Sequence, residues 1–358
     1  MSDLLTKGLA STDGTASRTY KHYDRPLWRR LLLNQESFVI ALLMLVAVYA
    51  SVALDHFATT TTLNFLLLDA APALLIALPM SLVIISGEID LSVGSIVGLS
   101  SVTLGFLSSH GWPIGMAMVA CLVVGLICGL INGLLVTVAG LPSLAVTIGT
   151  LALFRGLAVG LLGTNSITTF PEYWTNLTQA TIGDTGIPVV MIIVVIVIAL
   201  FSVLLHFTAF GRGVFAIGLS KDAATFSGIG VGRTKLILFV LSGIVSAFVG
   251  IYWTYLYGTA QGNNATGLEL AVIAPVLLGG VSVFGGKGAL PGVIGGVLLI
   301  GVLQSSLRLA NVTSDGINIL TGILLIISVI STTALAWGRR RKPAATAKAT
   351  GVNSRTKG

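Results

Sequence analysis

Two carboxylates, Glu88 and Asp90, follow an apolar run over residues 63–85 in which Asp69 is the only charged residue. An ionisable side chain at the centre of a membrane helix costs roughly 2.5 to 3.5 kcal/mol, so it is expected to face protein or a water-filled cavity. Asp90 could act as the N-cap of the next helix, because a carboxylate accepts hydrogen bonds from the free N–H groups of a first turn. Glu88 has no capping role and could instead be a solvated residue at the inner mouth of this break.

Two hydroxyl groups, those of Ser92 and Ser95, come directly after the carboxylates. They could line a polar path for a hydroxylated solute. Serine in a membrane helix more often bonds to the carbonyl one turn back, so a packing role is the alternative.

The composition indicates what must surround these residues. Of 358 residues, 54% are hydrophobic and 9% are charged, and the mean hydropathy is +0.97. Soluble domains carry about 25% charged residues. A water-soluble core cannot hide this much apolar surface, so the sequence predicts a polytopic all-α membrane protein.

The two cysteines, Cys121 and Cys128, are seven residues apart, a spacing that fits neither a redox pair nor a zinc site, and no metal is expected.

Ten apolar stretches approach spanning length, and the eighth is short enough to be a half-helix or re-entrant segment. The stretches cover residues 37–54, 63–85, 89–107, 113–139, 142–162, 187–206, 235–258, 270–284, 290–309 and 316–337. We therefore divide the chain into an N-terminal tail over 1–36, a transmembrane domain over 37–337 and a basic C-terminal tail over 338–358.

The net charge of +7 is concentrated beside the spans rather than on a nucleic-acid-binding face. Seven basic residues and no acid lie between Arg339 and Lys357. Positive charges next to membrane spans mark the cytoplasmic side, so both termini are expected inside and the number of spans should be even.

Ten spans with both termini inside make two halves of five with opposite orientation, an inverted repeat of the kind found in transporters. The second and third spans meet near Glu88 and Asp90, and the eighth and ninth meet near Lys287. Both junctions fall on the inner side, so one hypothesis pairs Lys287 with either carboxylate as a latch. The candidate path or gate residues are Glu88, Asp90, Ser92, Ser95 and Lys287.

Glycines recur every four residues in two places, a spacing that lets membrane helices approach closely. We interpret both rows as packing faces within the chain, with contact between subunits as the alternative. The rows are Gly125, Gly129 and Gly133, and Gly288, Gly292 and Gly296.

Three ordered motifs resemble the membrane permeases of ribose-type ATP-binding-cassette (ABC) importers. They are the stretch 87–95, the block 211–229 and the glycine-rich block 278–292. The resemblance covers roughly residues 37–337. Glu88 stands where the family usually has glycine, a variant loosely associated with permeases for deoxy-sugars such as rhamnose and for autoinducer 2.

The resemblance implies an import permease that is not itself an enzyme, with ATP and Mg²⁺ bound by a separate cytoplasmic subunit. No GxxxxGK[ST] phosphate loop occurs in the sequence, in agreement with this division. Further partners would be a second permease, identical or different, and an extracytoplasmic solute-binding protein, in a bacterial cytoplasmic membrane. The expected solute is a monosaccharide such as ribose, xylose or rhamnose, with autoinducer 2 as the alternative.

The resemblance also identifies the segment that would dock the ATPase, with a short coupling helix over 220–230. Asp222 lies in its first turn, where it favours the helix dipole, and Gly228 can end the helix. The alternative is that this segment is an ordinary solvated connection between two membrane helices. The coupling residues are Gly211, Arg212, Lys221, Asp222, Ala223, Ala224, Ser227, Gly228 and Ile229.

Two rival functions are compatible with parts of the sequence. An ion-coupled secondary transporter could use Glu88 or Asp90 to carry protons or Na⁺. An intramembrane enzyme is disfavoured because the sequence contains no HExxH or GxSxG motif.

Overall fold

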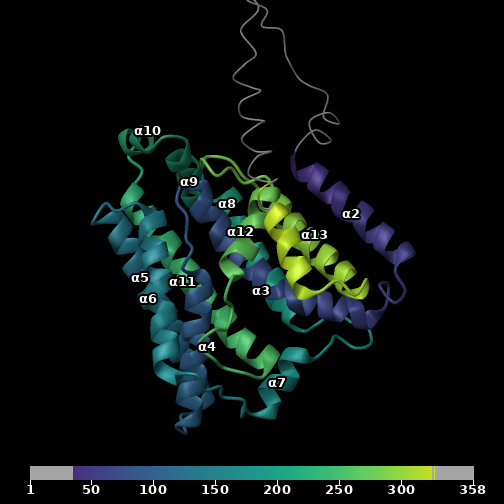
Figure 1. The fold of residues 1–358 in the computed structure, drawn as a ribbon. Coiled ribbons are helices and arrows are strands. Elements are labelled where there is room, and N and C mark those ends of the chain that lie inside the picture. The colour runs from purple at the N-terminus through teal and green to yellow at the C-terminus, as the bar shows by residue number, and fades with distance from the viewer. Residues whose placement is uncertain (1–34, 325, 327–358) are drawn as a thin grey trace, which may run out of the picture. The chain divides into compact units, whose positions relative to one another are not determined.

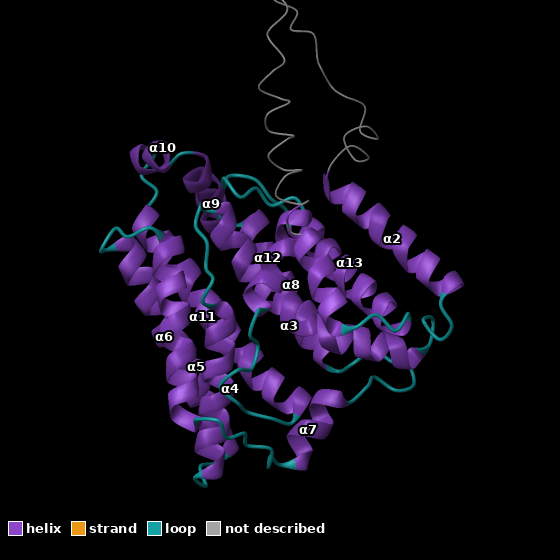
Figure 2. Cartoon of the chain, viewed as in Figure 1, coloured by secondary structure: helices purple, strands orange, loops and turns teal. Residues whose placement is uncertain are grey.

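The structure is a computed structural model that describes residues 35–324 and 326. The tails predicted over 1–36 and 338–358 therefore lie outside the described residues, apart from residues 35 and 36. Within the described part the regular structure is helical and contains no strand (Figure 2). Two isolated β-bridges pair Ile167 with Ala260 and Thr181 with Pro188.

Among the described residues, seven helices are long and apolar enough to cross a membrane. They are α2 (Gln35–Ala53), α3 (Thr60–Ile85), α5 (Ile114–Thr137), α6 (Ser143–Leu162), α8 (Val190–Phe207), α11 (Val231–Tyr257) and α13 (Leu290–Leu309). The shorter helices are α4 (Val93–Ser109), α7 (Glu172–Gln179), α9 (Ala209–Leu219), α10 (Lys221–Phe226) and α12 (Leu268–Leu278). Residues 314–324 are also helical.

Each predicted span corresponds to a helix, and the predicted all-α polytopic fold with some short or broken helices is confirmed. The third span begins at Val93 rather than at residue 89, because residues 88–92 are not helical. The eighth is the 11-residue α12, too short to cross a bilayer that needs about 20 helical residues. The tenth span was predicted over 316–337, and its residues beyond 326 lie outside the described part.

The packing of the central helices agrees with the inverted repeat. If α3 corresponds to α11, α4 to α12 and α5 to α13, then each contact should have a counterpart. The contact of α5 with α11 is matched by that of α13 with α3, and the contact of α4 with α11 by that of α12 with α3. The pair α4 and α5 is likewise matched by α12 and α13.

Glycines allow two helix pairs, α5 with α11 and α12 with α13, to approach backbone to backbone. A methyl group on Gly125, Gly129 or Gly133 of α5 would collide with α11, at Gly243, Phe239 and Leu236 respectively. In the same way Gly292 and Gly296 of α13 lie against Gly279 and Pro275 at the end of α12. Gly288 differs from the prediction, since it lies before α13 and packs beside Ile85 and Val281 rather than in a helical row.

The helices α9 and α10 lie at one end of the described helices and α7 lies at the opposite end (Figure 1). α3 runs through the middle, with every residue from Leu74 to Ile85 buried. The end of α3 near α9 is where the break predicted around Glu88 and Asp90 begins.

Candidate functional site

The break between α3 and α4 is a non-helical segment that α6 supports. Gly87 turns the chain with a φ of +84°, a conformation that favours glycine. The N–H of Ile89 then donates to Ser143 Oγ at 3.2 Å, and Thr147 Oγ1 donates to the carbonyl of Ile89 at 3.2 Å. Non-helical backbone inside a membrane protein needs such partners. Ser143 and Thr147 of α6 therefore pair with the backbone N–H and carbonyl of Ile89, which have no helical partner in the break.

Asp90 is the buried anchor of this segment, with an exposure of 1%. Its Oδ1 accepts hydrogen bonds from the N–H and Oγ of Ser92, at 3.0 and 2.6 Å, and its Oδ2 accepts one from Ser242 Oγ of α11 at 2.8 Å. The N-cap position of α4 belongs to Ser92, so the predicted capping role of Asp90 is corrected. Asp90 closes the turn before the helix and fastens it to α11.

Ser92 and Ser95 are fully buried in this conformation and make hydrogen bonds inside the protein. Asn132 Nδ2 of α5 donates to Ser92 Oγ at 2.7 Å, so a chain of hydrogen bonds runs from α5 through Ser92 to Asp90. Ser95 Oγ donates to the carbonyl of Ser92 at 2.7 Å, the pattern of the packing alternative. Asn132 Oδ1 is buried and has no hydrogen-bond partner among the described residues.

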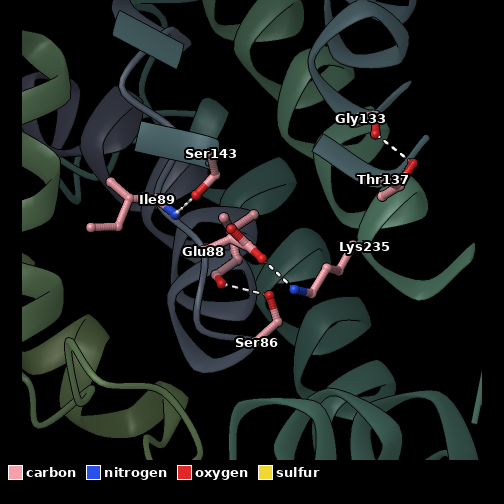
Figure 3. A network of polar contacts seen from close by, with 8 residues as sticks. Ser86, Glu88, Ile89, Gly133, Thr137, Ser143 and Lys235 are labelled. Carbon is pink, nitrogen blue, oxygen red and sulfur yellow. Dashed lines mark hydrogen bonds and ion pairs between the residues drawn. The ribbon is translucent and has the colours of Figure 1, made fainter. Parts of the chain in front are cut away.

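Glu88 forms an ion pair with Lys235 near the start of α11 (Figure 3). The side chains are only 14% and 11% exposed, so Glu88 is not a freely solvated residue. Lys287 is an exposed residue of the α12–α13 connection. In this conformation the partners of the two carboxylates are thus Lys235 and serines, rather than Lys287 as the sequence hypothesis proposed.

Arg155 of α6 is a site residue that the sequence reasoning missed. It donates to the carbonyls of Gly262 and Asn264 in the α11–α12 connection, at 2.8 and 2.6 Å, and to that of Gly94 in α4 at 3.2 Å. The available signal was its position as the only charged residue in the predicted span 142–162.

The first turns of α4 and α12 meet beside Arg155. A methyl group on Gly94 would collide with the carboxylate of Glu269 and lie 3.0 Å from the carbonyl of Ala265. Glu269 belongs to the first turn of α12, where a carboxylate favours the helix dipole. Two short helices thus begin at this point, α4 after the connection from the C-terminal end of α3 and α12 after the connection from the C-terminal end of α11.

The coupling segment contains a short helix where one was predicted over 220–230, although α10 covers only Lys221–Phe226, and a second helix, α9, precedes it. Gly211 and Arg212 lie in α9, and Lys221, Asp222, Ala223 and Ala224 lie in α10. Ser220 Oγ caps α10 by accepting from the N–H of Ala223 at 3.3 Å, and Gly228 follows with a φ of +79°.

Ala224 attaches α10 to the rest of the protein by packing with Ile217 and Val231, and Ile229 covers this cluster. The outer surface of the segment is exposed at Arg212, Lys221, Asp222, Ala223, Ser227 and Gly228. Two apolar side chains are also exposed there, Leu219 by 68% and Phe226 by 92%. Exposed apolar side chains of this kind on a polar segment suit a protein interface.

The coupling segment touches the break through the end of α3. Gly218 of α9 is packed against the carbonyl of Ile85 so closely that a side chain would not fit. The same carbonyl accepts a hydrogen bond from the N–H of Gly286 at 2.8 Å. A displacement of α9 would therefore reach the residues just before Glu88 and Asp90.

The model of the family described as "Branched-chain amino acid transport system / permease component" matches residues 61–329. The chain belongs to this permease family. It is similar to the autoinducer 2 import system permease protein LsrD of Photorhabdus luminescens, with 35% identity over 75% of this chain and 83% of the relative. The proteins of the same name from Salmonella typhimurium and Escherichia coli O157:H7 are 35% and 37% identical, over 75% of this chain and 85% and 83% of theirs. No solved structure matches the chain.

Membership of this permease family confirms the resemblance to the permeases of sugar-type ABC importers that the motifs indicated. The chain is a multi-pass membrane permease subunit of such an importer and is not itself an enzyme. A permease component implies an ATPase and a solute-binding protein as partners in a complete system.

Proposed function

We propose that this permease imports a monosaccharide-sized polyhydroxylated solute such as ribose, xylose or rhamnose, as one of two permease subunits in a bacterial cytoplasmic membrane. A separate ATPase subunit binds ATP and Mg²⁺, a binding protein delivers the solute from outside, and both termini are cytoplasmic. The observation that carries the proposal is the direct packing of the coupling segment on the end of α3 at Gly218 and Ile85.

The coupling segment has exposed side chains of the kinds that form a protein interface with an ATPase subunit. Phe226 and Leu219 offer exposed apolar anchors, and Lys221 and Asp222 offer charges around them. Interfaces commonly combine a few apolar anchors with a polar rim. Movement of the ATPase would pull on α9, and α9 would pass that movement to α3 and to the break.

The break is the element that we expect to change during transport. Its non-helical segment is held by hydrogen bonds to side chains of α6, α5 and α11 rather than by a continuous helix. Glu88, Asp90, Ser92, Ser95 and Lys287 remain the proposed path or gate residues. The pair Glu88 and Lys235 would close the inner side in the present state, and ATP binding would shift the population to another state.

Autoinducer 2 is a second candidate solute, favoured by the names of the three relatives reported above. It is a small oxygen-rich molecule, so the same chemistry of recognition would serve it. The two candidates differ only in which delivered solute accumulates.

The decisive experiment reconstitutes the permease with its partner subunits in proteoliposomes and supplies the binding protein outside. Uptake of labelled L-rhamnose, D-ribose, D-xylose and autoinducer 2 is measured with internal ATP, and separately with a proton or Na⁺ gradient. We expect one of these solutes to accumulate with ATP alone. Accumulation driven by an ion gradient without ATP would instead establish the secondary transporter.

A further inference from the structure

A pocket of about 440 Å³ lies between α3, α11, α12 and α13, away from the break. Its lining comes from the first half of α3 and the last turns of α11 and α13. These parts lie at the end remote from α9, which the proposed function makes the external side. Binding sites for small molecules usually have 300–1,000 Å³, so the space suits one monosaccharide with some water.

Charges of both signs meet on one wall of the pocket. Arg308 Nη1 lies 2.5 Å from Asp69 Oδ2, and the hydroxyl of Tyr257 donates to Asp69 Oδ1 at 3.4 Å. The side chains of Arg308 and Asp69 remain 57% and 35% exposed. An intramembrane carboxylate is costly and therefore marks a functional site by default. Because the two charges compensate one another, the pocket favours a neutral ligand.

Aromatic rings form the neighbouring wall. Trp253 and Tyr257 are one turn apart on α11, with ring centroids 4.9 Å apart and planes inclined by 52°, and Phe65 of α3 also lines the space. The face of an aromatic ring carries partial negative charge, which attracts the polarised C–H groups of a sugar ring. Gln304 adds an amide that can both donate and accept hydrogen bonds.

We propose that this pocket is the outward-facing subsite where the transported solute, a neutral polyhydroxylated molecule of monosaccharide size, first rests on the permease. Asp69 accepts hydrogen bonds from its hydroxyl groups, Arg308 donates to them, and Trp253 and Tyr257 cover one face of the ring. A purely structural ion pair between α3 and α13 would explain Asp69 and Arg308, but not the aromatic and amide groups gathered around the same space. The inference rests on the proposed function, and it places the first contact between solute and permease in the external half of the path.

The first test measures transport by the reconstituted system with the solute that wild-type protein accumulates. We expect Trp253→Ala and Asp69→Asn each to reduce uptake at subsaturating solute by about 10-fold or more, the effect of losing one hydrogen bond to a charged group or one ring contact. Tyr49→Ala is the matched control, because Tyr49 is a 70% exposed aromatic residue on α2, outside the pocket. Uptake and ATPase activity without solute should both stay unchanged in the control variant.

The second test does not depend on coupled transport. The permease carrying Gln304→Cys is treated in the assembled complex with a water-soluble methanethiosulfonate reagent, with and without binding protein loaded with the same solute. The natural Cys121 and Cys128 are buried and serve as the background in the parent protein. We expect labelling that solute slows by about 5-fold or more, whereas mannitol, used as a non-transported polyol, gives no protection.

Each outcome decides the inference. Protection together with the transport defects supports the subsite. Labelling without protection, in a system that still accumulates solute with ATP, overturns the subsite and leaves the proposed function intact. Labelling only by a lipid-soluble reagent, or a disulfide between two copies at Gln304→Cys, means that lipid or a second permease fills the pocket and also overturns it. Absence of ATP-driven uptake in the wild type is a failure of the proposed function instead.

Discussion

Glu88, in the break after α3, forms an ion pair with Lys235 in the second turn of α11, and both side chains are largely shielded from solvent. The pair links two helices that correspond in the inverted repeat. It fixes the inner end of the break to α11, while Asp90 fixes the following residues to the same helix through Ser242. The break therefore has two separate attachments to α11, one ionic and one buried.

The ionic attachment predicts a specific rescue. Glu88→Lys or Lys235→Glu alone should lower the free energy of unfolding by about 1 to 3 kcal/mol, between the values for surface and buried pairs, and should impair transport. The double variant with both changes should recover much of the loss. Thermal unfolding in detergent and ATP-driven uptake are the measurements.

The control for this rescue is Lys287→Glu, which exchanges the charge of an exposed lysine in the α12–α13 connection. We expect it to rescue neither stability nor transport in the Glu88→Lys background. If it restores transport but not stability, Glu88 and Lys287 interact in another state of the cycle, as the latch hypothesis requires.

The buried attachment predicts a similar loss of stability from a smaller change of side chain. Ser242→Ala removes one of the hydrogen bonds accepted by the buried Asp90 and should cost about 1.5 to 3 kcal/mol of stability, the range for hydrogen bonds to charged groups. Ser95→Ala is the matched control, because Ser95 is equally buried but donates only to a backbone carbonyl of its own helix. Equal losses of unfolding temperature for the two variants would contradict this account of Asp90.

The glycine contacts between α5 and α11 predict opposite effects for one substitution. Gly243→Ala should destabilise the protein by 1–3 kcal/mol, roughly the cost of overpacking, since a methyl group there meets the backbone of Gly125 and Gly129. Gly156→Ala on α6, where nothing lies within 4 Å, should stabilise its helix by about 0.5–1 kcal/mol. Unfolding temperatures of the two variants in the same detergent make the comparison.

The exposed face of the coupling segment predicts a loss of assembly without a loss of folding. Phe226→Asp should reduce co-purification with the ATPase subunit by about 10-fold or more, as expected when a buried aromatic anchor of an interface is removed. The variant should unfold at the wild-type temperature, because Phe226 is 92% exposed in the isolated chain. Tyr173→Asp, an exposed aromatic residue on α7 at the other end, is the control and should leave assembly unchanged.

The sequence predicted those features that depend on neighbouring residues along the chain. Apolar runs gave the helices, and the short eighth run gave the short α12. Gly228 and Asp222 marked the ends of α10 because capping is local. The partners of charged residues depend on which helices meet, so the sequence hypothesis paired Lys287 with either carboxylate, whereas the structure pairs Glu88 with Lys235. The inverted repeat correctly predicted that the residues around Glu88 and those around Lys287 lie at the same end of the helices. It did not predict which of the two lysines, Lys235 or Lys287, contacts Glu88.

The sequence did not predict that the first turns of α4 and α12 meet, because the non-helical segments before them have no periodic pattern. The residues 259–269 fall outside every predicted span. Their backbone is instead held inside by Arg155, and Asn264 is buried and donates to Ser101 Oγ at 2.8 Å. A single arginine in an apolar run was the available indication that such a segment needed a donor.

The role of Arg155 leads to a prediction about local stability. Arg155→Met keeps an unbranched apolar stem but removes the donors to Gly262, Asn264 and Gly94. We expect hydrogen exchange in the connection 258–267 to accelerate by about 10-fold or more, the equivalent of losing one charged hydrogen bond. Arg155→Lys should give an intermediate rate, because one ammonium group cannot reproduce the planar fork that spans three carbonyls.

Exchange in the turn 182–188, which is closed by its own backbone hydrogen bonds, is the internal control. An unchanged rate in 258–267 would mean that the bridge from Ile167 to Ala260 and the buried Asn264 hold this connection without Arg155.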